Sequence, residues 1–182
     1  FPLSGGNSAT SLLARGRGYN VLIRNELGSP TASLTGTINS GTIALPTSYT
    51  TTSGGATEDG WNFVGNPYPS AIDWDNAGWT KTNVTGNQIS VYDPAKPPSG
   101  GYRVWNGAVG DLGNGRIASG QGFWFKASAA PTLQVTEATK TTTSTTFYRK
   151  ASTDVDYLQI TLLGNEVEEN AFIQKVEGAK MG

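Results

Sequence analysis

The chain has 182 residues and a net charge of -1, with no long basic run, which argues against a nucleic-acid groove or an anionic membrane surface as partner. It contains no Cys and no His, so it can build neither a Ser-His-Asp nor a Cys-His nucleophile system, and zinc would lack its usual ligands. No run of about eighteen apolar residues occurs, so we expect no segment to span a membrane.

Short runs of alternating apolar and polar residues recur along the chain, separated by turn sequences rich in Gly, Pro, Asn and Ser. The predicted strands are Tyr19–Arg24, Ser33–Ile38, Trp61–Gly65, Ile89–Asp93, Tyr102–Asn106, Gly122–Lys126, Thr132–Val135, Thr145–Arg149, Tyr157–Leu163 and Ala171–Val176. The best helix candidate is one turn at Ser70–Asn76. The pattern predicts an all-β, mainly antiparallel fold, sandwich-like in the jelly-roll or Ig manner, with long Gly/Pro/Thr-rich loops.

The predicted domain is a single β-sandwich-like unit over residues 1–182. The segment "PTSYTTTSGGATEDG", residues 46–60, is long enough to be a connection between two smaller subdomains, so a split near 46–60 is the alternative.

Two segments form a weak internal repeat: "LARGRGYNVLI" (13–23) and "IASGQGFWFKA" (117–127). Each has Gly-x-Gly before an aromatic residue and an alternating strand. We interpret Gly16-x-Gly18 and Gly120-x-Gly122 as bends that need positive φ or a close backbone approach. A phosphate-binding loop is disfavoured, because the full GxGxxG pattern is absent and a strand follows instead of a helix.

The segment "GWNFVGNPYPSAIDWD", residues 60–75, combines two X-Pro steps, which enforce extended backbone, with Asp73 and Asp75 on either side of Trp74. Three roles compete for the two carboxylates. A general acid/base pair for glycoside cleavage is disfavoured. Calcium ligation by Asp73, Asp75 and Asn76 is plausible, although the Asp-x-Asp-x-Asp-Gly loop is absent. The favoured role is structural, with the carboxylates accepting backbone N–H groups at a stiff corner.

The five Trp residues divide by context. Trp61 and Trp124 lie in alternating strands and are predicted to build the core. The candidates for stacking on sugar rings lie in or near Gly- and Asn-rich loops: Trp74, Trp79, Tyr102 and Trp105.

Four segments together resemble β-rich modules of large Bacteroidetes-type exported proteins, which type IX secretion carries: "GWNFVGNPYPSAIDWD", "VYDP", "GGYRVWNG" and "IASGQGFWFKA". The similarity covers about residues 60–176. It implies a secreted or cell-surface location, a β-rich build and a place upstream of a C-terminal sorting domain. It carries over no catalytic motif.

We therefore expect a non-catalytic extracellular module that acts as a structural or adhesive unit of a surface protein or fibre. The alternative is a carbohydrate-binding module of a secreted polysaccharide-active enzyme. No cofactor is expected apart from the calcium candidate. The expected partners are neighbouring domains or subunits, reached through strand edges at Phe1–Leu13 or Ala171–Gly182, or a polysaccharide.

Overall fold

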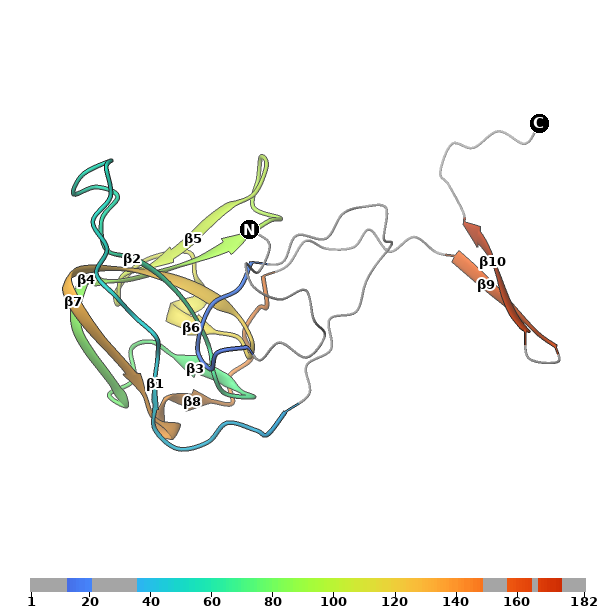
Figure 1. Ribbon diagram of the computed structural model, residues 1–182, viewed down its shortest axis with the longest axis horizontal. Helices are drawn as coiled ribbons and strands as arrows, with labels where there is room; N and C mark the ends of the chain where they lie inside the picture. Colours follow the sequence, from blue (N-terminus) through green and yellow to red (C-terminus); the bar gives the residue numbers. More distant parts are fainter. Residues whose placement is uncertain (1–12, 21–35, 149–156, 165–166, 175–182) are drawn as a thin grey trace. The chain divides into compact units, whose positions relative to one another are not determined.

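A computed structural model describes residues 13–20, 36–148, 157–164 and 167–174, and it divides into two compact units, residues 1–149 and 150–182 (Figure 1). The described residues form antiparallel strands, two 3-10 turns (η2, Gly113–Gly115, and η3, Glu137–Thr139) and no α-helix. The all-β, sandwich-like class predicted from the sequence is confirmed. None of the described residues belongs to a helix long and apolar enough to cross a membrane.

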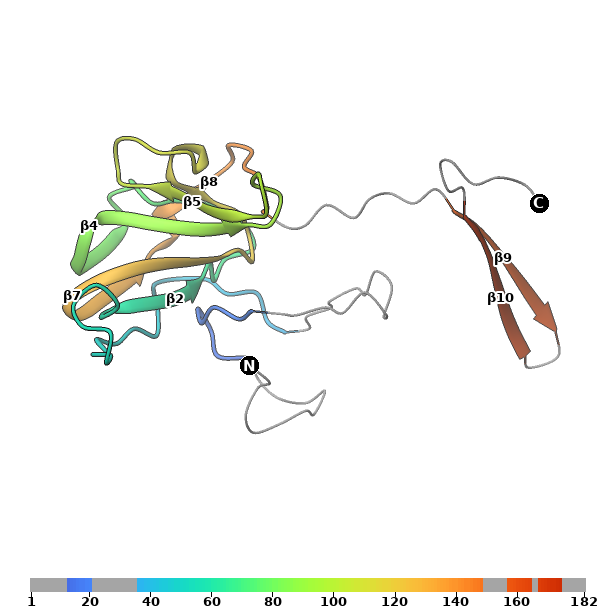
Figure 2. The same cartoon turned by 90° about the horizontal axis from the view of Figure 1, so that it is seen from above.

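The main sheet of the first unit is organised around one long strand, β7 (Gly122–Val135). Its first half pairs with β2 (Trp61–Gly65), and its second half pairs with β1 (Ile43–Ala44). On its other side β7 pairs with β4 (Trp79–Asp93), which pairs in turn with β5 (Gly101–Trp105). Figure 2 shows β2, β7, β4 and β5 side by side in this order. Residues 46–60, considered above as a subdomain boundary, connect β1 and β2, which pair with two different parts of β7.

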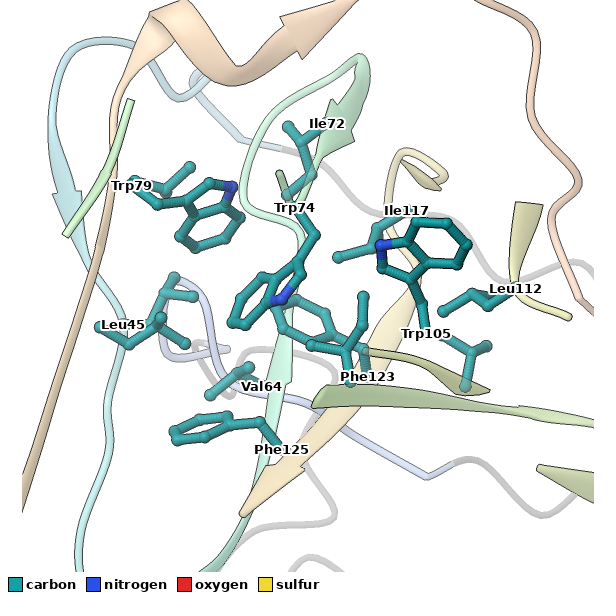
Figure 3. Packing of buried hydrophobic residues seen from close by; sticks show 14 of the residues in the cluster. Leu45, Val64, Ile72, Trp74, Trp79, Trp105, Leu112, Ile117, Phe123 and Phe125 are labelled. Carbon is teal, nitrogen blue, oxygen red and sulfur yellow. The ribbon is translucent and has the colours of Figure 1, made fainter. Parts of the chain in front are cut away.

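A second, smaller sheet contains β3 (Ala71–Asp73) between β6 (Arg116–Ile117) and β8 (Lys140–Thr141). Ile72 and Ile117 of this sheet join Ile89, Phe123 and Phe125 of the main sheet in one buried cluster (Figure 3). Both sheets therefore contribute one apolar face to a shared core, as a β-sandwich requires.

Most predicted strands overlap observed ones, and β2 has the predicted bounds. The helical turn predicted at Ser70–Asn76 is wrong: Ala71 and Ile72 pair with β8 and β6, and the Trp74 N–H donates to Gly115. A strand was also predicted over residues 145–149, but residues 145–148 form none. The Tyr148 N–H donates to the Gln121 side chain instead of to a neighbouring strand. The segments 36–38 and 19–20 of two further predicted strands are irregular, and the rest of those strands lies outside the described residues.

Both Gly-x-Gly segments are bends, as predicted, and the second leads into β7, whereas residues 19–20 after the first are irregular. Gly16 and Gly120 have φ of 74° and 70°, where a side chain is disfavoured. A Cβ on Gly18 or Gly122 would lie 2.5 or 2.6 Å from the Phe63 ring. The repeated segments therefore flank β2 on its two sides and both leave room for the same aromatic ring.

The second unit contains the antiparallel hairpin of β9 (Tyr157–Gly164) and β10 (Val167–Gln174), in which Tyr157 lies opposite Gln174. Of the terminal segments predicted to pack against a neighbour, residues 1–12 and 175–182 lie outside the described residues.

Candidate functional site

The Asn-Pro-Tyr-Pro corner after β2 is held by one buried amide, the side chain of Asn66. Its Nδ2 donates to the carbonyls of Ser70 (2.8 Å), Ala118 (2.9 Å) and Ile117 (3.2 Å). Its Oδ1 accepts the backbone N–H of Tyr68 at 3.0 Å. This amide thus ties the corner to the end of β6, and the unusual sequence of residues 60–75 has a structural role here.

Tyr68 fastens the same corner to the main sheet. Its ring is buried, and its hydroxyl donates to the carbonyls of Gly41 and Val135. Burial raises the pKa of the Tyr68 hydroxyl, and the nearby carboxylate of Glu137 raises it further, against a smaller lowering by Arg15. Tyr68 is therefore held as a protonated donor, which suits a structural hydroxyl.

Each predicted calcium ligand already accepts a hydrogen bond from the protein on one of its side-chain oxygens. Asp73 Oδ1 accepts the Asp75 N–H at 2.9 Å, and Asn76 Oδ1 accepts the Gly78 N–H at 2.8 Å. Asp75 Oδ2 accepts the indole N–H of Trp105 at 2.8 Å. The bond to Asp73 is the backbone bond that the structural role predicted, whereas Asp75 accepts a side-chain N–H. Together these bonds leave fewer oxygens to coordinate a cation.

A lysine provides the positive charge at this corner. Lys81 Nζ donates to the Trp74 carbonyl (2.9 Å) and to Asn87 Oδ1 (2.8 Å), and it lies 4.3 Å from the centre of the Trp74 ring. Burial lowers the pKa of Lys81, while the carboxylates of Asp75 and Asp73 act in the opposite direction. Lys81 thus balances the two carboxylates that a metal ion would otherwise neutralise.

Three of the predicted sugar-stacking residues are core residues instead. Trp74 is fully buried, and Trp79 and Trp105 are each 8% exposed (Figure 3). Their indole N–H groups donate to Asn87 O, Asp73 O and Asp75 Oδ2, respectively. In this structure none of the three rings offers a face to a sugar, although all three lie near polar turns, as the sequence indicated.

The prediction that Trp61 and Trp124 build the core is wrong, because the strands face the opposite way. In β2 the buried residues are Asn62 and Val64, so Trp61 lies on the outer face and is 43% exposed. In β7 Phe123 and Phe125 are buried, and Trp124 lies on the outer side with Lys126. The shared parity of Trp124 and Lys126 was a signal in the sequence for this outward orientation.

The outer side of the main sheet carries a group of aromatic residues that we call the aromatic face. Its members come from β2, β4, β5 and β7: Trp61, Phe63, Tyr92, Tyr102 and Trp124. Phe63 and Trp124 lie opposite each other and stack at 4.6 Å between ring centres. Tyr92 and Tyr102 are also cross-strand partners, with an edge-to-face contact at 5.4 Å.

The aromatic face contains a groove of about 490 Å³ lined by Trp61, Ser90, Tyr102 and Trp124. Trp61 and Tyr102, which is 49% exposed, are only partly covered. Of the four residues predicted to stack on sugars, Tyr102 is thus the one that lies on an open surface. The groove is mainly apolar, with the Ser90 hydroxyl as a polar group among the rings.

A charged network stabilises the β4–β5 hairpin that carries the two tyrosines. Arg103 Nε contacts Asp93 Oδ2 at 2.7 Å, and Lys96 Nζ contacts Asp111 Oδ2 at 2.8 Å. Burial raises the pKa of Asp93, but the bonds from Arg103 and from the Ala95 N–H outweigh this effect, so the pKa of this carboxyl is lowered. The carboxylates therefore remain ionised and support the hairpin.

The edges of the main sheet are partly occupied next to the aromatic face. On the β2 edge, Gly18 N–H donates to Phe63 O at 3.2 Å. On the β5 edge, Asp111 N–H donates to Val104 O at 3.0 Å, and Asp111 Oδ1 accepts the Val104 N–H. Strand addition by a partner would have to occur elsewhere than at these positions.

The comparisons with known proteins give a family but no activity. No curated protein and no solved structure matches the chain. Residues 4–163 match the family model described as "Domain of unknown function (DUF8693)". Because this match covers most of its length, the chain belongs to the DUF8693 family.

Proposed function

We propose that this domain is a non-catalytic adhesive module of an extracellular protein, and that it binds carbohydrate through the aromatic face. The observation that carries the proposal is the groove lined by Trp61, Ser90, Tyr102 and Trp124. Aromatic rings offer flat apolar surfaces to the C–H faces of sugars, while neighbouring hydroxyl and N–H groups bond to sugar hydroxyls.

The hydrogen bonds of the tryptophans support a ligand-binding role for the outer pair. Each buried indole N–H has a protein acceptor, as described above. The indole N–H groups of Trp61 and Trp124 donate to no other residue in the described part of the chain. Among the described residues the protein therefore makes no use of these two donors, in contrast to those of the buried tryptophans.

Two further observations support the non-catalytic and extracellular parts of the proposal. The sequence has no His or Cys, and the carboxylates of Asp73 and Asp75 accept N–H groups of the protein itself. Neither carboxylate lines the groove. The resemblance of residues 60–176 to modules of exported proteins supports a place outside the cell.

Affinity electrophoresis in native gels, each cast with one soluble polysaccharide, tests the proposal. We expect at least one polysaccharide to retard the full chain, and we expect Trp61→Ala to weaken this retardation strongly. Phe147→Ala is the matched control, since Phe147 is 47% exposed and does not line the groove. Thermal unfolding confirms that each variant is folded. Absence of retardation by every neutral and charged polysaccharide would refute carbohydrate binding, and the same face would then be tested as a protein interface.

A further inference from the structure

We infer that the groove binds an internal segment of a neutral, extended polysaccharide, with the chain crossing the strands of the main sheet obliquely. The inference rests on the proposed function and specifies its ligand. It depends on three properties of the groove: the line along which the rings lie, the charge of the lining, and the flat apolar surfaces that the rings present.

The strand register fixes the line of the groove. Trp61 on β2 lies opposite Lys126, two residues from Trp124 on β7. Trp124 lies opposite Ser90 on β4, and Ser90 lies opposite Val104, two residues from Tyr102 on β5. The four lining residues thus follow one diagonal from β2 to β5.

Sheet geometry gives the length of this diagonal. Neighbouring strands are about 4.8 Å apart, and alternate residues of a strand are about 6.8 Å apart. Three strand spacings and two such steps separate Trp61 from Tyr102 by about 20 Å between backbones. A surface of that length exceeds a single sugar ring and fits several units of an extended chain.

Within the part of the chain that the structure describes, both ends of the diagonal remain accessible. Trp61 and Tyr102, the end members, are about half exposed, and they belong to the two outer strands of this part of the sheet. A chain on the groove can therefore continue past either ring. This favours an internal segment over a chain end, which would need a closed pocket.

The charge of the groove favours a neutral chain. The lining residues are uncharged. Lys96, beside Tyr102, donates to the Tyr102 carbonyl and to Asp111 Oδ2. Lys126, on the same side of β7 as Trp124, is also engaged. Its Nζ donates to the carbonyls of Ala56 (2.8 Å) and Thr57 (2.9 Å), and it lies 5.9 Å from the centre of the Trp61 ring. A chain of uronic acids would find no unpaired cation among these residues, and its carboxylates would lose hydration on the aromatic rings.

The flat rings complete the chemistry. The lining is almost wholly apolar, so sugar rings would be held mainly by stacking of their C–H faces on the aromatic rings, with the Ser90 hydroxyl as a polar group beside them. Among neutral polymers, β-1,4-linked chains are flat and extended, and their successive rings present such faces. We therefore choose this class as the ligand.

Isothermal titration of the full chain with oligosaccharides of increasing length tests the inference. The probes are cellotriose, cellohexaose, xylotriose, xylohexaose, mannotriose and mannohexaose, with polygalacturonic acid as the charged chain. We expect at least one neutral hexasaccharide to bind about tenfold or more tightly than its trisaccharide, because it covers one further half-exposed ring. We also expect its affinity to be insensitive to salt between low and moderate ionic strength.

Variants at the two ends of the diagonal locate the chain. Trp61→Ala and Tyr102→Ala are each expected to lower the hexasaccharide affinity about tenfold, and Phe147→Ala is expected to leave it unchanged. Two variants on different strands keep the test decisive if one fails to fold. Equal affinity for trisaccharide and hexasaccharide, stronger binding of polygalacturonic acid, or loss in only one folded end variant would refute the inference while leaving carbohydrate binding intact. If electrophoresis shows no retardation by any polysaccharide, the proposed function fails together with it.

Discussion

Replacing Asn66 with Ala should destabilise the first unit more than most single substitutions would. Asn66 is 6% exposed, and its amide serves three carbonyls and one N–H at the corner after β2. Ala118 O also accepts the Gln121 N–H, so it keeps one partner. The Tyr68 N–H and the Ser70 carbonyl lose the partner described here, and each buried orphan group costs about 1–3 kcal/mol. These orphan groups and the small cavity left behind should together lower the free energy of unfolding by about 3 kcal/mol.

Urea unfolding followed by tryptophan fluorescence measures this loss. The midpoint should fall while the dependence on urea stays the same, and the melting temperature should drop by about 10 °C for a unit of this size. Asn39→Ala is the matched control, because Asn39 donates one bond to the Pro67 carbonyl at the same corner. We expect it to cost about 1 kcal/mol or less.

Asn66→Asp separates the two functions of the amide. It keeps an acceptor for the Tyr68 N–H but places a negative oxygen against the three carbonyls, so at neutral pH it should destabilise at least as much as Asn66→Ala. A loss for Asn66→Ala no larger than that for Asn39→Ala would refute the reasoning, because it would mean that the corner holds without the amide.

Three further substitutions test other contacts of the first unit by thermal unfolding. Gly122→Ala should cost about 1–2 kcal/mol, because the new Cβ would lie 2.6 Å from the Phe63 ring, which must shift. Asp75→Ala should cost about 1–2 kcal/mol by removing the acceptor of the Trp105 indole N–H. Asp93→Asn should weaken the acid sensitivity of the unit. The folded-state pKa of Asp93 is lowered, so its stabilisation is complete above the ordinary value of 3.8 and is lost as the pH falls from there through the folded-state pKa.

Controls accompany these substitutions. Gly36→Ala adds a Cβ that meets nothing within 4 Å and should be neutral. Asp75→Asn keeps an oxygen acceptor for Trp105 and should recover most of the loss. Equal effects of Asp75→Ala and Asp75→Asn would contradict the role of the indole bond, and an unchanged acid transition in Asp93→Asn would contradict the role assigned to its ionised carboxylate.

The sequence predicted the fold class and several strands because these depend on local pattern. The bounds of β2 follow from its alternation, and the two Gly-x-Gly segments follow from the backbone freedom of Gly. The turn after Pro69 was assigned wrongly because its outcome depends on distant partners. Ala71 and Ile72 pair with residues far along the chain, and no local signal specifies those pairings.

The candidate site was predicted only in part, because both faces of β2 and β7 carry apolar residues. Alternation shows that Trp61 and Val64 lie on opposite sides of β2, but it does not say which side is buried. Size favoured the Trp side, whereas the structure buries Asn62, whose amide bonds to Ser48 N and Ser48 O. The Asn62 side chain bonds to the backbone of Ser48 as a neighbouring strand would, and this contact between distant residues has no local signal in the sequence. Lys126, two residues from Trp124, was the available indication of the outer face.

Where β7 pairs with β2 it carries aromatic residues on both sides, Phe123 and Phe125 on the inner side and Trp124 on the outer side, so hydrophobicity alone sets its register against β2 only weakly. A slip by one residue would turn Trp124 inward and Phe123 outward, so that part of the aromatic face would be exchanged for part of the core. The register must therefore be set by residues whose contacts would be lost on such a slip. These are the buried amides of Asn62 and Asn66, which bond to specific carbonyls, and Gly122, which leaves room for the Phe63 ring. The residues that keep Trp124 on the outer side are thus two asparagines and a glycine. Substituting them should lower the stability of the β2–β7 pair, and with it that of the proposed binding surface, although none of them lines the groove.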